Sequence, residues 1–237
     1  MKKKEKINWL PKLIEIPIIV GSILLALYFE NWNEQLNQKA AEQDYLENLK
    51  NEFTINLNEV SSDQQFRSEQ INICNKLIDH INAKNVQRIP NDSLERWLQY
   101  VLPVRFYSPT HAVLNDIINS GNINLIESAP LRRALMRYTN LVQKGITIEQ
   151  LEFNYIQALE QYLIQHGCYR FFLNDDSSNS IRLERKDRQQ LENVMNSPQF
   201  LDYLYGRVKK LEETVYFTSP KNHVIERIIS IIDLYIE

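Results

Sequence analysis

The histidines and acids of this sequence lack the spacing that metal binding needs. No two histidines stand at the H-x-x-x-H or H-x-x-E-H spacing that places two imidazoles on one helical face. The four are His80, His111, His166 and His223. The oxygen-rich run at 175–179 lacks the central glycine and terminal glutamate of a calcium loop and indicates a solvated turn. We expect no metal and no cofactor.

Groups with the pattern of a catalytic centre are equally scarce. Only 5 glycines occur, and the sequence has no G-x-G-x-x-G, Walker A or G-x-S-x-G motif. Acids are numerous, but no spacing pairs two of them as acid and base. Arg132, Arg133 and Arg137 could bind an anion from one helical face, although arginines on helices usually face water. We predict that the protein is not an enzyme.

The two cysteines, Cys74 and Cys168, are too few for a disulfide-built fold and lack C-x-x-C spacing. They permit one bridge, which an oxidising compartment would favour. Cys74 lies within an apolar stripe, where a free thiol packs well as a small hydrophobe. The sequence leaves a Cys74–Cys168 disulfide and two free thiols open.

The element that precedes these residues is an apolar run at 13–29, interrupted only by Glu15. Its length is at the lower limit for crossing a bilayer as a helix. Trp9 precedes the run, and Tyr28 and Trp32 lie at its far end, where aromatic rings favour the headgroup regions. We predict a transmembrane signal anchor at 13–31, uncleaved because no A-x-A-like site follows it.

Charge around the run predicts its orientation. Residues 1–12 hold five lysines and one acid, a net charge of +4, whereas the next basic residue after the run is Lys39. Cytoplasmic segments carry such an excess, so we expect 1–12 to be a basic cytoplasmic tail and 32–237 a periplasmic domain at the bacterial inner membrane. The chain totals −3, which leaves −7 outside the tail. A net acidic body argues against nucleic acid as a partner.

Small residues in the anchor could bring two copies together. Gly21 or Ser22 with Ala26 forms a small-x-x-x-small face, which lets helices approach closely in a membrane. The expected partners are therefore the lipid bilayer and either another protein or a second copy of this chain.

Beyond the anchor, apolar residues recur every three or four positions, which is typical of amphipathic helices. The first stripe should pack on later helices and consists of Leu46, Leu49, Phe53, Leu57 and Val60. Helices are also expected after the caps at 128–130, 197–198 and 219–220, while Gly121 should end a short one. Residues 169–183 indicate a small hairpin or an irregular excursion. The fold class predicted is all-α: a transmembrane helix and an irregular soluble helical bundle.

Several short motifs recur in one known family. They are Glu15-Ile16, G-S-I-L-L-A-L at 21–27, N-W-N-E at 31–34, Y-L-E-N-L at 45–49, S-G-N-I-N-L-I at 120–126, and Leu131-Arg132 with Tyr138. In these the chain resembles a family of uncharacterised bacterial single-pass membrane proteins, known as a domain of unknown function. Ile14 and Pro17 depart from its pattern, which usually has a glycine before the acid and aliphatics after it. The resemblance implies a Gram-negative envelope protein and no particular reaction.

Three functions are compatible with these observations. The favoured one is a membrane-anchored envelope module that binds a protein partner or assembles with itself. The alternatives are a periplasmic sensor for a small ligand that acts through a partner, and a tethered enzyme. An exposed apolar patch would favour the first, an enclosed pocket the second, and a cluster of strongly perturbed acids the third.

Overall fold

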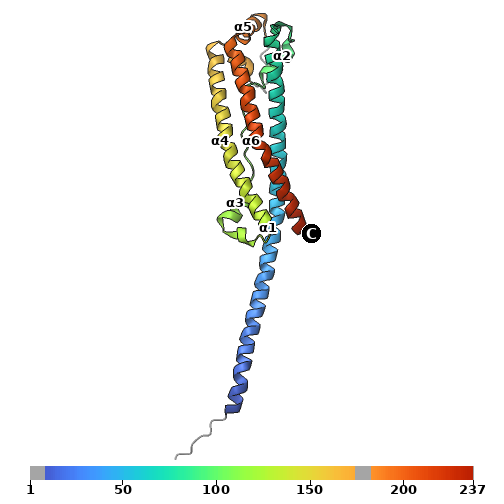
Figure 1. Cartoon of the computed structure of the whole chain (residues 1–237), viewed down its shortest axis with the longest axis vertical. Coiled ribbons are helices and arrows are strands. Elements are labelled where there is room, and N and C mark those ends of the chain that lie inside the picture. The colour runs from blue at the N-terminus through green and yellow to red at the C-terminus, as the bar shows by residue number, and fades with distance from the viewer. Residues whose placement is uncertain (1–8, 174–182, 237) are drawn as a thin grey trace, which may run out of the picture.

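In the part of the chain that the structure describes, three long α-helices and three short ones are joined by 3₁₀ turns and irregular segments (Figure 1). The computed structural model describes residues 9–173 and 183–236, with side chains from Ile18 onward. No strand occurs within those residues, which confirms the all-α fold class. The α-helices are α1 (Trp9–Asn82), α2 (Asn91–Leu98), α3 (Ala112–Asn119), α4 (Ala129–Gln165), α5 (Arg185–Met195) and α6 (Pro198–Ile236). The 3₁₀ turns are η1 (Val86–Arg88), η2 (Asn122–Leu125) and η3 (Tyr169–Phe172).

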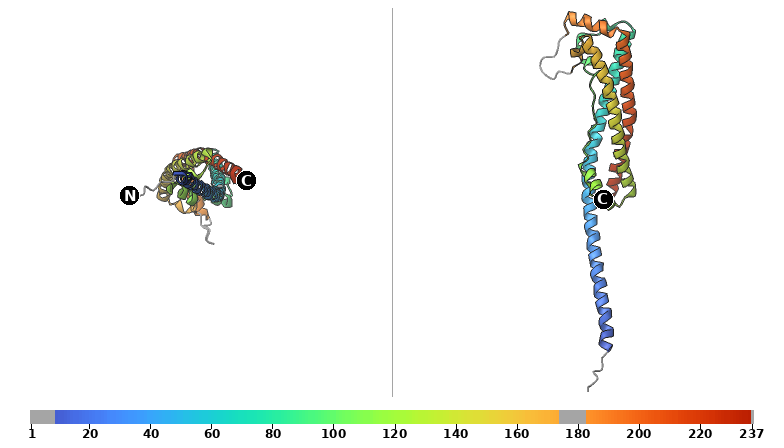
Figure 2. Two further views of the ribbon diagram at one scale, coloured as in Figure 1. Left: turned by 90° about the horizontal axis from the view of Figure 1, so that it is seen from below. Right: turned by 90° about the vertical axis from the view of Figure 1, so that its left-hand side faces the viewer.

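Helix α1 is a single helix of 74 residues, about 110 Å long at 1.5 Å per residue. Its N-terminal half leaves the bundle with no other described segment beside it (Figures 1 and 2). Its C-terminal half packs in the bundle, starting at Leu46. The predicted stripe is buried at Leu46, Leu49, Phe53 and Val60 and half-buried at Leu57, which confirms that it belongs to the core.

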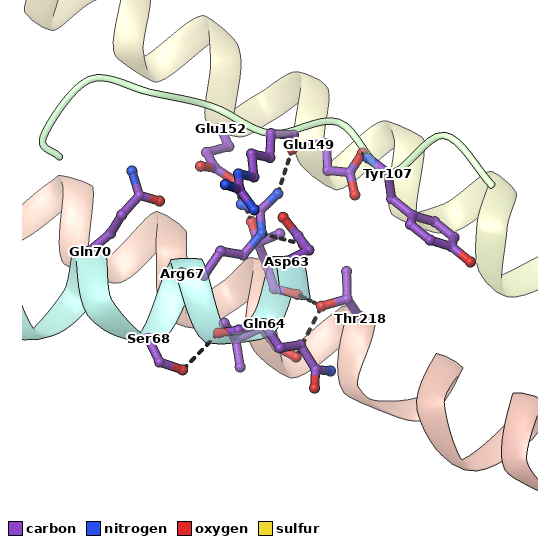
Figure 3. Close-up of polar contacts among 12 residues, drawn as sticks. Asp63, Gln64, Arg67, Ser68, Gln70, Tyr107, Glu149, Glu152 and Thr218 are labelled. Atoms are coloured by element: carbon purple, nitrogen blue, oxygen red, sulfur yellow. Dashed lines mark hydrogen bonds and ion pairs between the residues drawn. The ribbon is translucent and has the colours of Figure 1, made fainter. Parts of the chain in front are cut away.

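Helix α6 lies antiparallel to α1 and α4 and packs along both of them. An extended segment at 103–111, here called the strap, runs lengthwise between α1 and α4 (Figure 3). Below the strap the two helices meet directly through Phe53 and Tyr138, whose ring centroids are 4.9 Å apart. The bundle is therefore three helices and a strap of irregular backbone.

The core consists of two apolar clusters separated along the bundle axis. The lower cluster, near the stalk-like half of α1, includes Phe53, Leu135 and Ile228. The upper cluster, beneath α2 and α5, includes Leu77 and Phe200. Between them lies a layer of buried polar side chains, here called the polar belt. Its members are Asp63, Arg67, Gln70, Glu149, Glu152, Arg207, Thr214, Thr218 and Lys221.

Two helix ends have the capping residues that the sequence predicts. The Ser128 hydroxyl accepts a hydrogen bond from the amide of Leu131 and caps α4, with Pro130 in the first turn. Gly121 has φ +77°, a left-handed conformation that glycine adopts without strain, and it follows the end of α3 at once. The S-G-N-I-N-L-I motif is thus a helix end followed by a tight 3₁₀ connection.

Two expectations differ from the structure. Of the two alternatives for 169–183, a small hairpin or an irregular excursion, the described part does not show the hairpin, because Tyr169–Phe172 forms a 3₁₀ turn whose two phenylalanines enter the upper cluster; residues 174–182 lie outside the described ones. The separate helix expected after 219–220 is wrong, because α6 continues through Pro220. A proline there removes one backbone donor, and the buried Val224, Ile225 and Ile228 beyond it hold the helix in place.

Candidate functional site

The stalk-like part of α1 presents an apolar surface on every side. Its large hydrophobic side chains are between 49% and 66% exposed. They are Ile18, Ile19, Val20, Ile23, Leu24, Leu25, Leu27, Tyr28, Phe29, Trp32 and Leu36. An apolar surface this extensive marks an interaction site on a protein or in a membrane. We call residues 18–36 the apolar stalk.

The residues predicted to pack or anchor this helix lie on the stalk and contact no other described element. Gly21 has open space where a Cβ would point, and the Ser22 hydroxyl donates to the carbonyl of Ile19 at 2.8 Å. Ala26 is exposed, as are Tyr28 and Trp32. The side chain of Trp9 lies outside the described ones. The positions predicted for helix packing are thus uncovered.

No helix within the described part of the chain is both long enough and apolar enough to cross a membrane. The transmembrane signal anchor predicted at 13–31 is therefore not supported by the structure. The basic tail predicted at 1–12 lies mostly outside the described residues.

Cys74 and Cys168 are both buried in the upper cluster, and both are free thiols. The Cys168 thiol donates to the carbonyl of His166 at 3.5 Å. Burial raises the pKa of Cys74 to about 11, so its sulfur stays protonated at neutral pH and is a poor nucleophile. Of the two alternatives, the structure has the separate thiols rather than the disulfide, since each packs as a small apolar side chain.

The polar belt is centred on Glu152, which is fully buried and bonded to two arginines from different helices (Figure 3). Arg207 donates from Nη1 to Glu152 Oε1 at 2.6 Å, and Arg67 pairs with Glu152 Oε2. Arg67 also donates from Nε to Asp63 Oδ2 at 2.8 Å. Burial alone would lower the pKa of Arg67, but Glu152 and Asp63 outweigh it and the pKa is raised. Arg67 therefore stays charged inside the bundle.

Most remaining polar groups of the belt bond to the backbone around the strap. Arg67 Nη2 donates to the carbonyl of Arg105 at 2.5 Å, and Arg207 donates to those of Val101 and Pro103 at 2.9 and 2.8 Å. Gln70 donates to the carbonyls of Tyr100 and Pro103. An extended segment that pairs with no strand leaves its amides and carbonyls to be satisfied by side chains. The belt does this.

Two further buried side chains of α1 form hydrogen bonds with the backbone at the lower end of the strap and at the start of α3. Asn56 exchanges two hydrogen bonds with the backbone of Thr110, at 2.7 and 2.9 Å. The Glu52 carboxylate accepts from the amides of Val113 and Leu114 at 2.8 and 3.2 Å. Those amides are free because they begin α3, and a carboxylate there is also favoured by the helix dipole. Helix α1 therefore fixes both the strap and the helix that follows it.

A second buried pair, Glu149 and Lys221, is held less tightly. Lys221 Nζ lies 3.8 Å from Glu149 Oε1, which has no hydrogen-bond partner, and 4.4 Å from the centre of the Tyr107 ring. The other oxygen of Glu149 accepts from the Tyr107 amide at 3.0 Å. Burial raises the pKa of Glu149 and lowers that of Lys221. The lysine fits because Gly145 has no side chain where Nζ lies.

The belt holds matched charges and is closed to solvent. Its three acids, Asp63, Glu149 and Glu152, face three bases, Arg67, Arg207 and Lys221, and all six are at most 7% exposed. A substrate cannot reach groups buried to this extent. Within the described part of the chain, no cluster of three or more His, Cys, Asp or Glu could hold a metal ion. The arrangement supports the strap and has the geometry of a structural element.

Sequence reasoning missed these belt residues, although the signal for them exists. Val60, Asp63, Arg67, Gln70 and Cys74 continue the apolar stripe of α1 at spacings of three and four, and all five are buried. Polar side chains in the phase of an apolar stripe indicate either a break in the core or a buried network. Because charged side chains are rarely buried, the stripe alone does not distinguish the two.

Comparison of the chain with protein-family models, with curated proteins and with solved structures finds no match. The resemblance to a family of single-pass membrane proteins therefore stays a prediction.

The Glu149 carboxyl gives the stability of the bundle a dependence on pH. Because its folded pKa lies above the ordinary 4.5, the folded state binds more protons, and this contribution is present below pH 4.5 and lost as pH rises through the folded pKa. Glu149→Gln should remove this loss, because it removes the titrating carboxyl. The free energy of unfolding of the variant should therefore rise relative to that of wild type as pH rises, by about 1.4 kcal/mol for each unit by which the folded pKa exceeds the ordinary one. Denaturant titrations from about pH 4 to 8 measure this.

The matched control is Glu212→Gln, which alters an exposed carboxyl on α6. The difference in free energy of unfolding between this variant and wild type should stay constant across the same pH range. A constant offset for Glu149→Gln as well would contradict the prediction.

Proposed function

We propose that the chain is a membrane-anchored interaction module. The anchor at 13–31 sits in a lipid bilayer, and the helical bundle is held beyond the bilayer to bind a protein partner or a second copy of the chain. The observation that carries this proposal is the exposure of large apolar side chains on all faces of a helix that continues, unbroken, into the bundle core.

A lipid bilayer is the favoured environment for the apolar stalk because its apolar side chains surround the helix and do not form a single stripe. A helix that packs on one partner helix needs an apolar seam along one side only, whereas a helix that is apolar all round is suited to lipid. The apolar run begins at Leu13, five residues before the first described side chain. The five lysines that precede it and the aromatic residues Tyr28 and Trp32 at its far end fit the flanks of a membrane helix.

The polar part of α1 between stalk and bundle acts as a spacer in this proposal. Residues 37–41 lie between the apolar stalk and the first contacts with the bundle, which Glu42 and Gln43 make, so the bundle base stands about 10 Å from the stalk. The lysine excess at the N-terminus favours a periplasmic bundle at the inner membrane. A rigid spacer and buried, mutually bonded ionisable groups suit presentation of a surface better than catalysis.

Membrane attachment is tested by carbonate extraction of cell membranes. We expect the intact protein to resist extraction, and Leu24→Arg to weaken attachment, because an arginine near the centre of a membrane helix costs about 2.5–3.5 kcal/mol. Leu151→Arg is the control, since Leu151 is as exposed as the stalk residues but lies on the bundle. It should leave attachment unchanged.

The orientation is tested by a reporter fused after Glu237 that is active only in the periplasm, which should be active. Activity of a cytoplasm-only reporter at the same position would show the opposite orientation. Full extraction of the wild-type protein by carbonate would refute the anchor itself.

A further inference from the structure

A groove lies between α4 and α6 in the half of the bundle nearer the stalk. Its volume is about 550 Å³. Apolar and basic side chains line it together. They include Arg137, Leu141 and Lys144 on α4 and Tyr216, Phe217 and Arg227 on α6. The two helices run side by side here in both side views (Figures 1 and 2).

The groove concentrates positive charge on an acidic body. Arg137, Lys144 and Arg227 are exposed, and none forms an ion pair or a side-chain hydrogen bond with another described residue. The buried bases, in contrast, all face acids. The chain outside residues 1–12 carries −7, so three cations around one groove form a local field of opposite sign. Such a field attracts and orients an acidic partner.

The groove also exposes apolar and polar groups suited to a peptide. Tyr216 is 74% exposed and Phe217 49%, and their rings pack edge to face with centroids 5.3 Å apart. Aromatic side chains of this kind dominate the energetics of protein interfaces. Because Pro220 has no amide hydrogen, the carbonyl of Tyr216 lacks its helical donor and is free to accept from a bound molecule.

We propose that this groove is the docking site for an acidic amphipathic helix of a partner protein. The inference rests on the proposed interaction function and names the chemistry of the partner. A channel between two antiparallel helices accepts a third helix with its apolar face against Leu141, Tyr216 and Phe217 and its acids against the three cations. The groove is not enclosed, which suits a helix better than a small ligand, whose site buries most of its surface.

The test uses the intact protein in detergent and a fluorescein-labelled helical peptide of about three turns with leucines on one face and glutamates on the other. We expect it to bind, with affinity that falls as salt rises, and a peptide with glutamine in place of glutamate to bind at least about tenfold more weakly. Arg137→Glu with Arg227→Glu should weaken binding of the glutamate peptide by about tenfold or more.

The control is Arg185→Glu with Lys209→Glu, which makes the same change in net charge at exposed positions outside the groove. It should bind the glutamate peptide as wild type does. Equal loss in both double variants, or equal binding of the glutamine peptide, overturns the proposal. Binding of laurate at the groove without binding of the peptide overturns it too, in favour of a small anionic ligand. Carbonate extraction is independent of this result, so failure of either proposal is recognisable separately.

Discussion

Arg67→Met is expected to lower the free energy of unfolding by about 3–5 kcal/mol, as removal of one partner from a buried ion pair does. The change leaves Glu152 with one arginine and deprives Asp63 and the Arg105 carbonyl of their donor. For a domain of this size the melting temperature should fall by roughly 6–20 °C. Thermal unfolding of the purified intact protein, followed by far-ultraviolet circular dichroism, measures the effect.

The control is Arg133→Met on α4, where the arginine is exposed and has no side-chain bond to any described residue. It should melt within a degree or two of wild type. Arg67→Met with Glu152→Gln should cost less than the sum of the single changes, because each single change already breaks the Arg67–Glu152 ion pair. Additive losses would show that the belt does not act as one network.

Phe53→Ala is expected to cost about 3–5 kcal/mol, because it opens a cavity in the lower cluster. The ring is fully buried and packs edge-on against Tyr138, so no solvent or mobile side chain can fill the space. Ile55→Ala is the matched control on the same helix, since Ile55 is 56% exposed. If Phe53→Ala keeps the melting temperature of wild type, α1 is a free stalk and the bundle described above does not form in solution.

The apolar part of the fold could be predicted because it follows local rules. The stripe from Leu46 to Val60 shows a helical period, and Ser128, Pro130 and Gly121 satisfy the conformational and hydrogen-bonding needs of helix ends. Each of these signals lies within a few residues of the structure it determines. Helix existence and burial of the stripe were therefore accessible from sequence.

The polar belt could not be predicted because its cause is not local. Arg67, Glu152 and Arg207 come from three helices, separated by 85 and 55 residues along the chain. Nothing near any of them shows that an irregular strap will lie inside the bundle and require partners for its backbone. On residue type alone, charged side chains belong at the surface. Pro220 was misjudged for a similar reason, since packing beyond it outweighs one lost hydrogen bond.

The contact between the first packed turns of α1 and the last turns of α6 affects when the bundle can form during synthesis. Gln43 donates to the carbonyl of Tyr235, 192 residues later, and Lys50 pairs with Asp233 at 2.7 Å. The apolar stripe of α1 is synthesised long before α6, the helix that covers it. A nascent chain must therefore carry an uncovered stripe until α6 emerges, a topology that slows folding and exposes the chain to aggregation. Loss of residues 232–236 would leave that stripe partly uncovered.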